Sequence, residues 1–279
     1  MQIKSINYIN FRNLKNNKLE FHPRFNLFMG KNGQGKTSIL EAIYFSITGK
    51  SFRTKHIKEL IKYDYQDAGA MINYEDRLGK KSIGIKFNGK TREYLYNKSK
   101  VKFDEFIGRV NVISFIPDDI YLILGNPSLR RTFFDYEIAQ GNEIYYKNLK
   151  YFNKILKIRN KFLKEGKSKD PLFEVYNEKF IELSVKIFSK RFEYIKKLSV
   201  LLNLNYRKLF SDKSELKIVY KSFSENIFKS EDIMKEEFIK TLDKVEKQEK
   251  YRGVSLVGPQ KDDFIFYLND KEAKAYTSQ

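Results

Sequence analysis

The sequence predicts a mixed α/β fold into which a helical lobe is inserted. Three observations support this fold class. Short apolar and alternating segments, typical of strands, occupy residues 1–126; apolar residues recur at helical spacing through 127–250; and the strand pattern returns over 251–279. We therefore expect 1–126 and 251–279 to belong to one domain and 127–250 to form the lobe. The 279 residues are enough for one large domain or two ordinary ones.

The first elements are predicted by their apolar patterns. Residues 3–8 alternate apolar and polar side chains, as a half-buried strand does, and residues 19–21 are a plausible partner strand. Residues 25–29 form a short, mostly apolar run that predicts a buried strand. Residues 38–45 are apolar at helical spacing and predict the helix that follows.

A hairpin and a further strand are expected next. Two strand-like runs, 83–87 and 91–96, flank Asn88-Gly89, and this dipeptide accepts the positive φ angles of a tight turn. Residues 110–115 predict another strand, which ends before Pro117.

The lobe is predicted as two antiparallel helices. Apolar residues recur at helical spacing over 145–163 and again over 173–201, with a polar connector at 165–171. These stripes are more typical of a helical core than of a cofactor site. Two short strands, 254–257 and 264–268, follow the lobe.

Between the expected strand 25–29 and the expected helix lies a complete G-x-x-x-x-G-K-[ST] motif, which is typical of a phosphate-binding loop. Its three glycines permit backbone angles that turn several N–H groups toward one anion, and the helix start adds its positive dipole. Lys36 is expected to reach the β- and γ-phosphates of ATP, and the Thr37 hydroxyl to bind Mg²⁺. The expected nucleotide-binding residues of the loop are Gly30, Lys31, Asn32, Gly33, Gln34, Gly35, Lys36 and Thr37.

Composition narrows the class of protein and of partner. The formal charge of +19 favours a polyanion, either nucleic acid or an anionic membrane face, although a lysine-rich coding bias alone could also produce it. Cysteine is absent, which excludes disulfides and thiolate metal sites. The N-terminus lacks the apolar segment of a secretion signal, and no apolar run approaches a membrane span. We therefore expect a cytoplasmic protein.

Nucleotide hydrolysis would also need an acid that holds Mg²⁺, usually at the end of an apolar strand. Asp118 and Asp119 follow the expected strand 110–115, but Pro117 separates them from it. The acids at 262–263 precede a strand instead of following one. The sequence therefore favours the interpretation that the metal-binding acid is not in this chain.

Several motifs together resemble the RecF family of bacterial DNA replication and repair ATPases, relatives of ABC and SMC proteins. The motifs are the Phe-Arg-Asn element at 11–13, the run from the phosphate loop to Ser-Phe-Arg at 51–53, the segment 115–135 and the segment 252–263. Gln260 and Lys261 depart from the His-Arg that the family usually carries. The chain ends at Ser278-Gln279, which resembles the start of the family's signature motif, so the C-terminal part of an ABC-type ATPase head is expected to be missing.

The resemblance implies a function. The intact protein would bind ATP and Mg²⁺, form a homodimer around two nucleotides, and bind single-stranded or gapped DNA in gap repair and the SOS response with RecO and RecR. It also implies that Arg12 reaches the nucleotide and that Ser278 faces the γ-phosphate of the partner subunit. By the same resemblance Asp118 is not the metal-binding acid, and this chain would hydrolyse ATP negligibly.

Alternatives remain open from the residues. Arg12 could be an ordinary surface arginine. Arg130 and Arg131 are candidate DNA contacts or structural arginines, and the sequence slightly favours ion pairs at the lobe boundary. The whole chain could instead be a compact ATPase that uses Asp118, or a basic, non-catalytic DNA-binding fragment.

Overall fold

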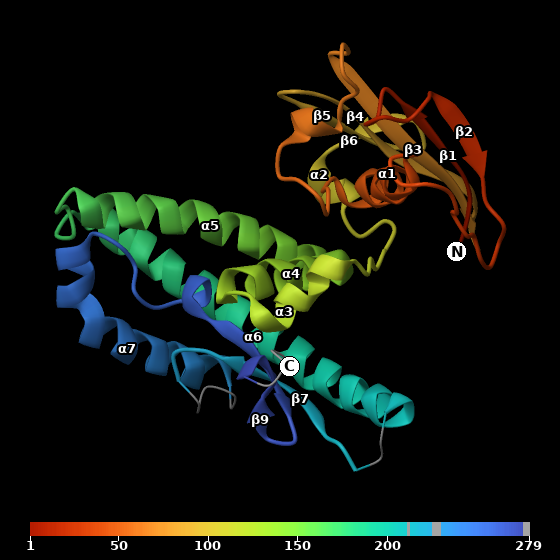
Figure 1. The fold of residues 1–279 in the computed structure, drawn as a ribbon. Coiled ribbons are helices and arrows are strands. Elements are labelled where there is room, and N and C mark those ends of the chain that lie inside the picture. The colour runs from red at the N-terminus through yellow and green to blue at the C-terminus, as the bar shows by residue number, and fades with distance from the viewer. Residues whose placement is uncertain (211–212, 225–229, 276–279) are drawn as a thin grey trace. The chain divides into compact units, whose positions relative to one another are not determined.

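The computed structural model describes residues 1–210, 213–224 and 230–275 and divides into two compact units, Met1–Ser114 and Phe115–Gln279 (Figure 1). The first unit contains β1 (Gln2–Ile9), β2 (Asn17–Glu20), α1 (Lys36–Thr48), β3 (Asp67–Asp76), β4 (Gly79–Asn88), β5 (Arg92–Tyr96), β6 (Ser99–Val101) and α2 (Phe103–Phe106). The second contains α3 (Tyr121–Leu124), α4 (Pro127–Gly141), α5 (Glu143–Lys164), α6 (Pro171–Leu209), β7 (Leu216–Lys221), α7 (Glu231–Arg252), β8 (Asp263–Leu268) and β9 (Lys271–Glu272).

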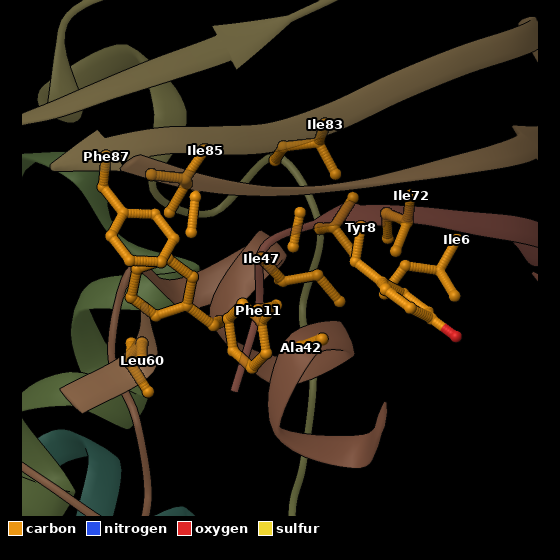
Figure 2. Packing of buried hydrophobic residues seen from close by; sticks show 14 of the residues in the cluster. Ile6, Tyr8, Phe11, Ala42, Ile47, Leu60, Ile72, Ile83, Ile85 and Phe87 are labelled. Atoms are coloured by element: carbon orange, nitrogen blue, oxygen red, sulfur yellow. The ribbon is translucent and has the colours of Figure 1, made fainter. Parts of the chain in front are cut away.

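The first unit is a six-stranded sheet, in the order β2-β1-β3-β4-β5-β6, with α1 packed against β3 and β4. Alternation along the strands gives this sheet one apolar face. Ile6 and Tyr8 of β1, Ile72 of β3 and Ile83 of β4 are all buried and meet α1 in a single core (Figure 2). The α/β class is confirmed. Every strand pair in the described part of the chain is antiparallel, where the sequence predicted a mixed sheet.

The predicted hairpin is present as β4 and β5, but its turn differs from the expected one. The loop spans residues 88–91, and the Asn88 side chain accepts hydrogen bonds from the Lys90 and Thr91 N–H groups, at 2.9 and 2.8 Å. The tight two-residue turn lies one connection later, at Asn97-Lys98, where both residues have positive φ (48° and 66°). Asn88 therefore closes its turn with a side chain instead of left-handed backbone.

Two of the strands predicted before residue 116 are wrong. Residues 25–29 and 110–115 form no strand, although both are apolar. A strand needs a partner that completes its hydrogen bonds, and no described strand pairs with either segment. Phe25, Leu27 and Met29 consequently lie exposed before the phosphate loop.

The second unit is built on three packed helices, α5, α6 and α7, with a small sheet in the order β7-β8-β9 (Figure 1). The two predicted antiparallel helices are α5 and α6, joined by the expected polar connector. Side chains fix where the helices begin: Asn142 caps α5, Asp170 caps α6 and Ser230 caps α7, each accepting a backbone N–H of the first turn.

Arg191 of α6 lies at the centre of this unit and is fully buried. Its guanidinium donates two hydrogen bonds to Asp135, both 2.9 Å, one to Asp262 at 3.0 Å and one to the Pro259 carbonyl at 2.7 Å. Asp262 also accepts the Tyr220 hydroxyl. One arginine thus ties α4, α6, β7 and the loop before β8 together.

The end of the described chain contains one of its two predicted strands. Strand β8 confirms the prediction for 264–268, and it pairs with β7 of the second unit. The division into two compact units lies at 114/115, and the domain plan expected from the sequence, with a boundary at 126/127 and a return of 251–279 into the first domain, stays a prediction. The predicted strand 254–257 is wrong, because the N–H groups of Ser255 and Leu256 donate to the side chains of Asn160 and Glu249 instead.

Candidate nucleotide-binding site

The glycine loop has the geometry that its motif predicts. Gly30, Gly33 and Gly35 have φ of 149°, 82° and 93°, which side chains with a Cβ rarely adopt. A Cβ on Gly35 would also lie 2.6 Å from Cδ2 of Leu14. The loop therefore needs glycine at 35 both for its backbone angle and for its packing.

Helix α1 begins immediately after the loop, at Lys36, and its N-terminus is bare. Gly35 is the N-cap residue, no side chain caps the first turn, and that turn contains no acidic residue. The first N–H groups of a helix have no partner within it, and the helix dipole is positive at this end. These features fit an anion such as a phosphate.

Lys36 crosses back over the loop. Its Nζ donates hydrogen bonds to the carbonyl oxygens of Gly30, at 2.7 Å, and Lys31, at 2.9 Å. Gln34 closes the loop from the other side, where its Oε1 accepts the Lys31 N–H at 3.1 Å. The ammonium group is thereby held at the mouth of the loop, beside the bare helix start.

Residues 11–14, which follow β1, support the phosphate loop through side-chain contacts. The Asn13 side chain donates to the Gly33 carbonyl at 2.8 Å and accepts the Ser38 hydroxyl at 3.1 Å. Asn13 therefore joins the loop to the first turn of α1, and Leu14 packs against Gly35. The sequence indicated residues 11–13 only through the family resemblance.

Arg12 faces the same site, but its guanidinium is already bonded. It forms a two-point ion pair with the Glu41 carboxylate, at 3.0 and 2.8 Å, and donates to the Glu59 carbonyl at 2.7 Å. Arg53 reaches the same carboxylate at 3.2 Å, and the Ser51 hydroxyl donates to it as well. A direct contact from Arg12 to a nucleotide stays a prediction.

Glu41 belongs to the structure of the candidate site, and the sequence did not point to it. It lies on α1, is completely buried, and holds two arginines beside the loop. The available signal was a glutamate inside an otherwise apolar helical run, because a charge is buried only when it is paired.

These residues surround one cavity of about 710 Å³, within the range of small-molecule sites. Thr37 lines it, as a ligand for Mg²⁺ would need to. Gly30, Lys31 and Gln34 shape the loop without lining the cavity. The lining residues are Arg12, Asn13, Asn32, Gly33, Gly35, Lys36, Thr37, Ser38, Arg53, Glu59, Ile61, Lys62 and Tyr63.

The candidate DNA-contacting arginines point into the second unit. Arg130 is buried and forms a two-point ion pair with Asp263, at 2.7 and 2.8 Å. Arg131 donates to the Asp262 carbonyl at 2.6 Å, and burial lowers the pKa of its guanidinium. This geometry favours the structural alternative, and a DNA contact from either residue stays a prediction.

The remaining candidates lie in the second unit or outside the described residues. Asp118 and Asp119 lie in a short 3-10 turn, where Asp119 accepts the Ile116 N–H at 2.8 Å. Gln260 donates to the Val257 carbonyl at 2.9 Å, beside Lys261. Ser278 lies outside the described residues.

Two further kinds of feature are absent from the part of the chain that the structure describes. Among residues 1–210, 213–224 and 230–275, no group of three His, Cys, Asp or Glu side chains is placed to hold a metal ion. None of the helices in the part of the chain that the structure describes is long and apolar enough to cross a membrane.

This chain is similar to known proteins. The family model for the RecF/RecN/SMC N terminal domain matches residues 2–118. The chain is similar to the DNA replication and repair proteins RecF of Alkaliphilus oremlandii (35% identical, covering 100% of this chain and 77% of the relative) and Halalkalibacterium halodurans (34%, covering 100% and 76%).

This chain is also similar to a solved structure of a recombination mediator protein RecF with ATP, from the RecFOR pathway. The two superpose with a TM-score of 0.92 at 30% sequence identity, and the match covers all of this chain and 76% of the chain in that structure. The expected fold, the P-loop head with a helical lobe, is confirmed by this match. These matches cover all of this chain and about three quarters of each relative. The chain therefore belongs to the RecF family.

Proposed function

We propose that this chain binds ATP in the loop Gly30–Thr37, with Mg²⁺ on the Thr37 hydroxyl, and that it acts on DNA in replication and recombinational repair. The observation that carries the proposal is the combination of Lys36 with the bare N-terminus of α1. A cation and a row of free N–H groups are what a triphosphate needs, and Thr37 lines the same cavity.

Removal of Lys36 tests the nucleotide part. A charge-assisted hydrogen bond to phosphate contributes about 1.5–3 kcal/mol, so Lys36→Ala should weaken ATP binding roughly ten- to a hundredfold. Calorimetry with Mg²⁺-ATP measures this. Lys90→Ala is the matched control, because Lys90 is an exposed lysine at the 88–91 turn of the same unit and does not line the cavity. Equal affinities for Lys36→Ala and the wild type would refute the assignment.

Omission of Mg²⁺ tests the metal. A metal held by Thr37 and the phosphates should make ATP binding stronger in Mg²⁺ than in EDTA. Thr37→Val keeps the shape of the side chain and removes its hydroxyl. Its ATP affinity should depend less on Mg²⁺ than that of the wild type, and an unchanged dependence would exclude Thr37 as a ligand.

The charge distribution supports DNA as the polyanion. Residues 1–114 carry 22 Lys and Arg against 10 Asp and Glu, and therefore hold +12 of the chain's +19 charge. If binding neutralises six phosphates, log K should fall against log salt with a slope of about −5 on duplex DNA. A flat slope in a fluorescence-anisotropy titration would mean that the charge reflects coding bias.

The proposal also covers the protein partners of this chain and its cellular compartment. The similar solved structure is described as a protein of the RecFOR pathway, and this supports RecO and RecR as partners. We also infer an ATP-dependent homodimer in the cytoplasm, on single-stranded or gapped DNA. Analytical ultracentrifugation with and without Mg²⁺-ATP tests the dimer, and a mass that ignores nucleotide would contradict it.

A further inference from the structure

We propose that Tyr63 is the platform on which the base of the bound nucleotide stacks. The inference rests on the proposed function, and it adds a subsite for the base to the subsite for the phosphates. Tyr63 lines the same cavity as Lys36 and Thr37, yet its side chain is 89% exposed. A large aromatic ring left in water at the edge of a polar cavity is available to cover a flat apolar group.

The ring is presented by a turn. The Tyr65 N–H donates to the Lys62 carbonyl at 3.1 Å, so Tyr63 and Asp64 are the two central residues. Asp64 has φ of 69°, a left-handed angle that aspartate adopts more readily than most residues. This conformation places Tyr63 at the tip of the turn.

The turn is fixed to the wall of the phosphate site. The Lys62 N–H donates to the Asn10 carbonyl at 2.7 Å, and the Arg12 N–H donates to the Leu60 carbonyl at 2.8 Å. The Arg12 guanidinium adds a third bond, to the Glu59 carbonyl at 2.7 Å. Leu60 is buried in the core (Figure 2). These hydrogen bonds fix the turn that carries Tyr63, and therefore the position of Tyr63 relative to the phosphate loop.

The cavity is chemically divided in a way that matches a nucleotide. The phosphate loop and α1 supply Lys36, the helix start and Thr37, which suit the phosphates. The segment after Leu60 supplies Ile61 and the Tyr63 ring, which suit a flat base. Stacking a base on an aromatic side chain tolerates any base, because each has a π face. The platform therefore adds affinity without selecting adenine.

Tyr65 provides a matched control on the same turn. Its side chain is 50% exposed, but it does not line the cavity, and the Lys62 ammonium already lies 5.9 Å from its ring centre. A substitution at 65 removes an equal ring from the same turn and leaves the proposed platform in place.

The experiment compares two ligands, Mg²⁺-ATP and inorganic tripolyphosphate with Mg²⁺, by calorimetry on the full chain. Tyr63→Ala should weaken ATP binding roughly 5- to 100-fold and leave tripolyphosphate binding unchanged. Tyr63→Phe should retain ATP affinity, because the ring and not the hydroxyl makes the contact. Tyr65→Ala should match the wild type for both ligands, whereas Lys36→Ala should weaken the binding of both by roughly ten- to a hundredfold.

The outcomes separate the platform from the nucleotide site itself. An unchanged ATP affinity in Tyr63→Ala would overturn the platform while the phosphate site stands. Equal losses of affinity for ATP and tripolyphosphate in Tyr63→Ala would mean that Tyr63 supports the loop instead of the base. A loss in Tyr63→Phe as large as in Tyr63→Ala would assign the effect to the hydroxyl. Either outcome would overturn the stacking platform. A wild type that binds neither ligand would refute the proposed function, and the platform with it.

Discussion

The two units solve the problem of a buried charge in opposite ways. In the first unit a single carboxylate, Glu41, is completely buried and holds two arginines, whose side chains are 17% (Arg12) and 45% (Arg53) exposed. In the second unit an arginine, Arg191, is fully buried and holds two carboxylates, Asp135 and Asp262.

The two networks differ in their access to solvent: the one around Glu41 borders the candidate binding site, whereas the one around Arg191 holds the helices of the second unit together. The arginines of Glu41 line a cavity, so part of their charge faces water and is available to an anion. The groups around Arg191 have no such opening: Tyr145 and Tyr220 cover them, and their hydroxyls donate to the two carboxylates. A buried network that is fully bonded fixes one arrangement of the helices around it.

Breaking the second network should have the largest effect. Arg191→Met removes the partner of Asp262, which is buried, and of Asp135, which is half-buried, and should lower the free energy of unfolding of the second unit by about 3–5 kcal/mol. Urea unfolding followed by hydrogen exchange of α6 peptides isolates this unit, since the chain has two compact units. Lys190→Met, at the exposed neighbouring position, should change it by less than about 0.5 kcal/mol. A small loss at Arg191 would mean that the network does not stabilise the unit.

A pH titration sharpens the comparison. Burial raises the pKa of Asp262 to about 6 from the usual 3.8, although Arg191 and Tyr220 oppose the shift. The folded state therefore binds this proton more tightly than the unfolded state, and its contribution to stability falls as pH rises from about 4 to 6. The loss amounts to at most about 3 kcal/mol.

Asp262→Asn isolates this contribution. The stability of the wild type relative to Asp262→Asn should decline between pH 4 and pH 7, measured by the same exchange experiment. A relative stability that rises over this interval would show that the pKa of Asp262 is lowered by Arg191 instead.

The smallest effect is expected in the first unit. Glu41→Gln keeps hydrogen-bonding atoms near Arg12 and Arg53 but removes the charge, and the two arginines can turn toward water. The free energy of unfolding, followed through exchange of α1 peptides, should fall by about 1–2 kcal/mol. Glu20→Gln, at an exposed surface pair with Lys18, is the control and should have almost no effect. A loss as large as that of Arg191→Met would remove the distinction between the two networks.

The sequence predicted what is local. The phosphate loop, α1, the paired helices α5 and α6 and the β4–β5 hairpin all depend on residues close together in the chain. The strands expected at 25–29 and 110–115 failed for the opposite reason, because strand formation depends on a partner that an apolar run does not specify.

In the candidate site, too, the sequence predicted the residues of one local motif but not the contacts between distant parts of the chain. Lys36 and Thr37 could be predicted from one motif, whereas the role of Glu41 required the knowledge that Arg12 and Arg53 both meet α1. Tyr63 could not be predicted either. It is connected to the loop by backbone hydrogen bonds between residues 10–12 and 60–62, which no side-chain pattern records.

The cavity has a consequence for biosynthesis. All the residues that line it fall between positions 12 and 63, and the unit that contains them ends at Ser114. At ordinary translation rates the following 165 residues take roughly 10–30 s to emerge. During that interval the first unit can already fold on the ribosome. A ligand stabilises whatever folded state it binds, so cellular nucleotide would act on the nascent chain before α5 and α6 exist.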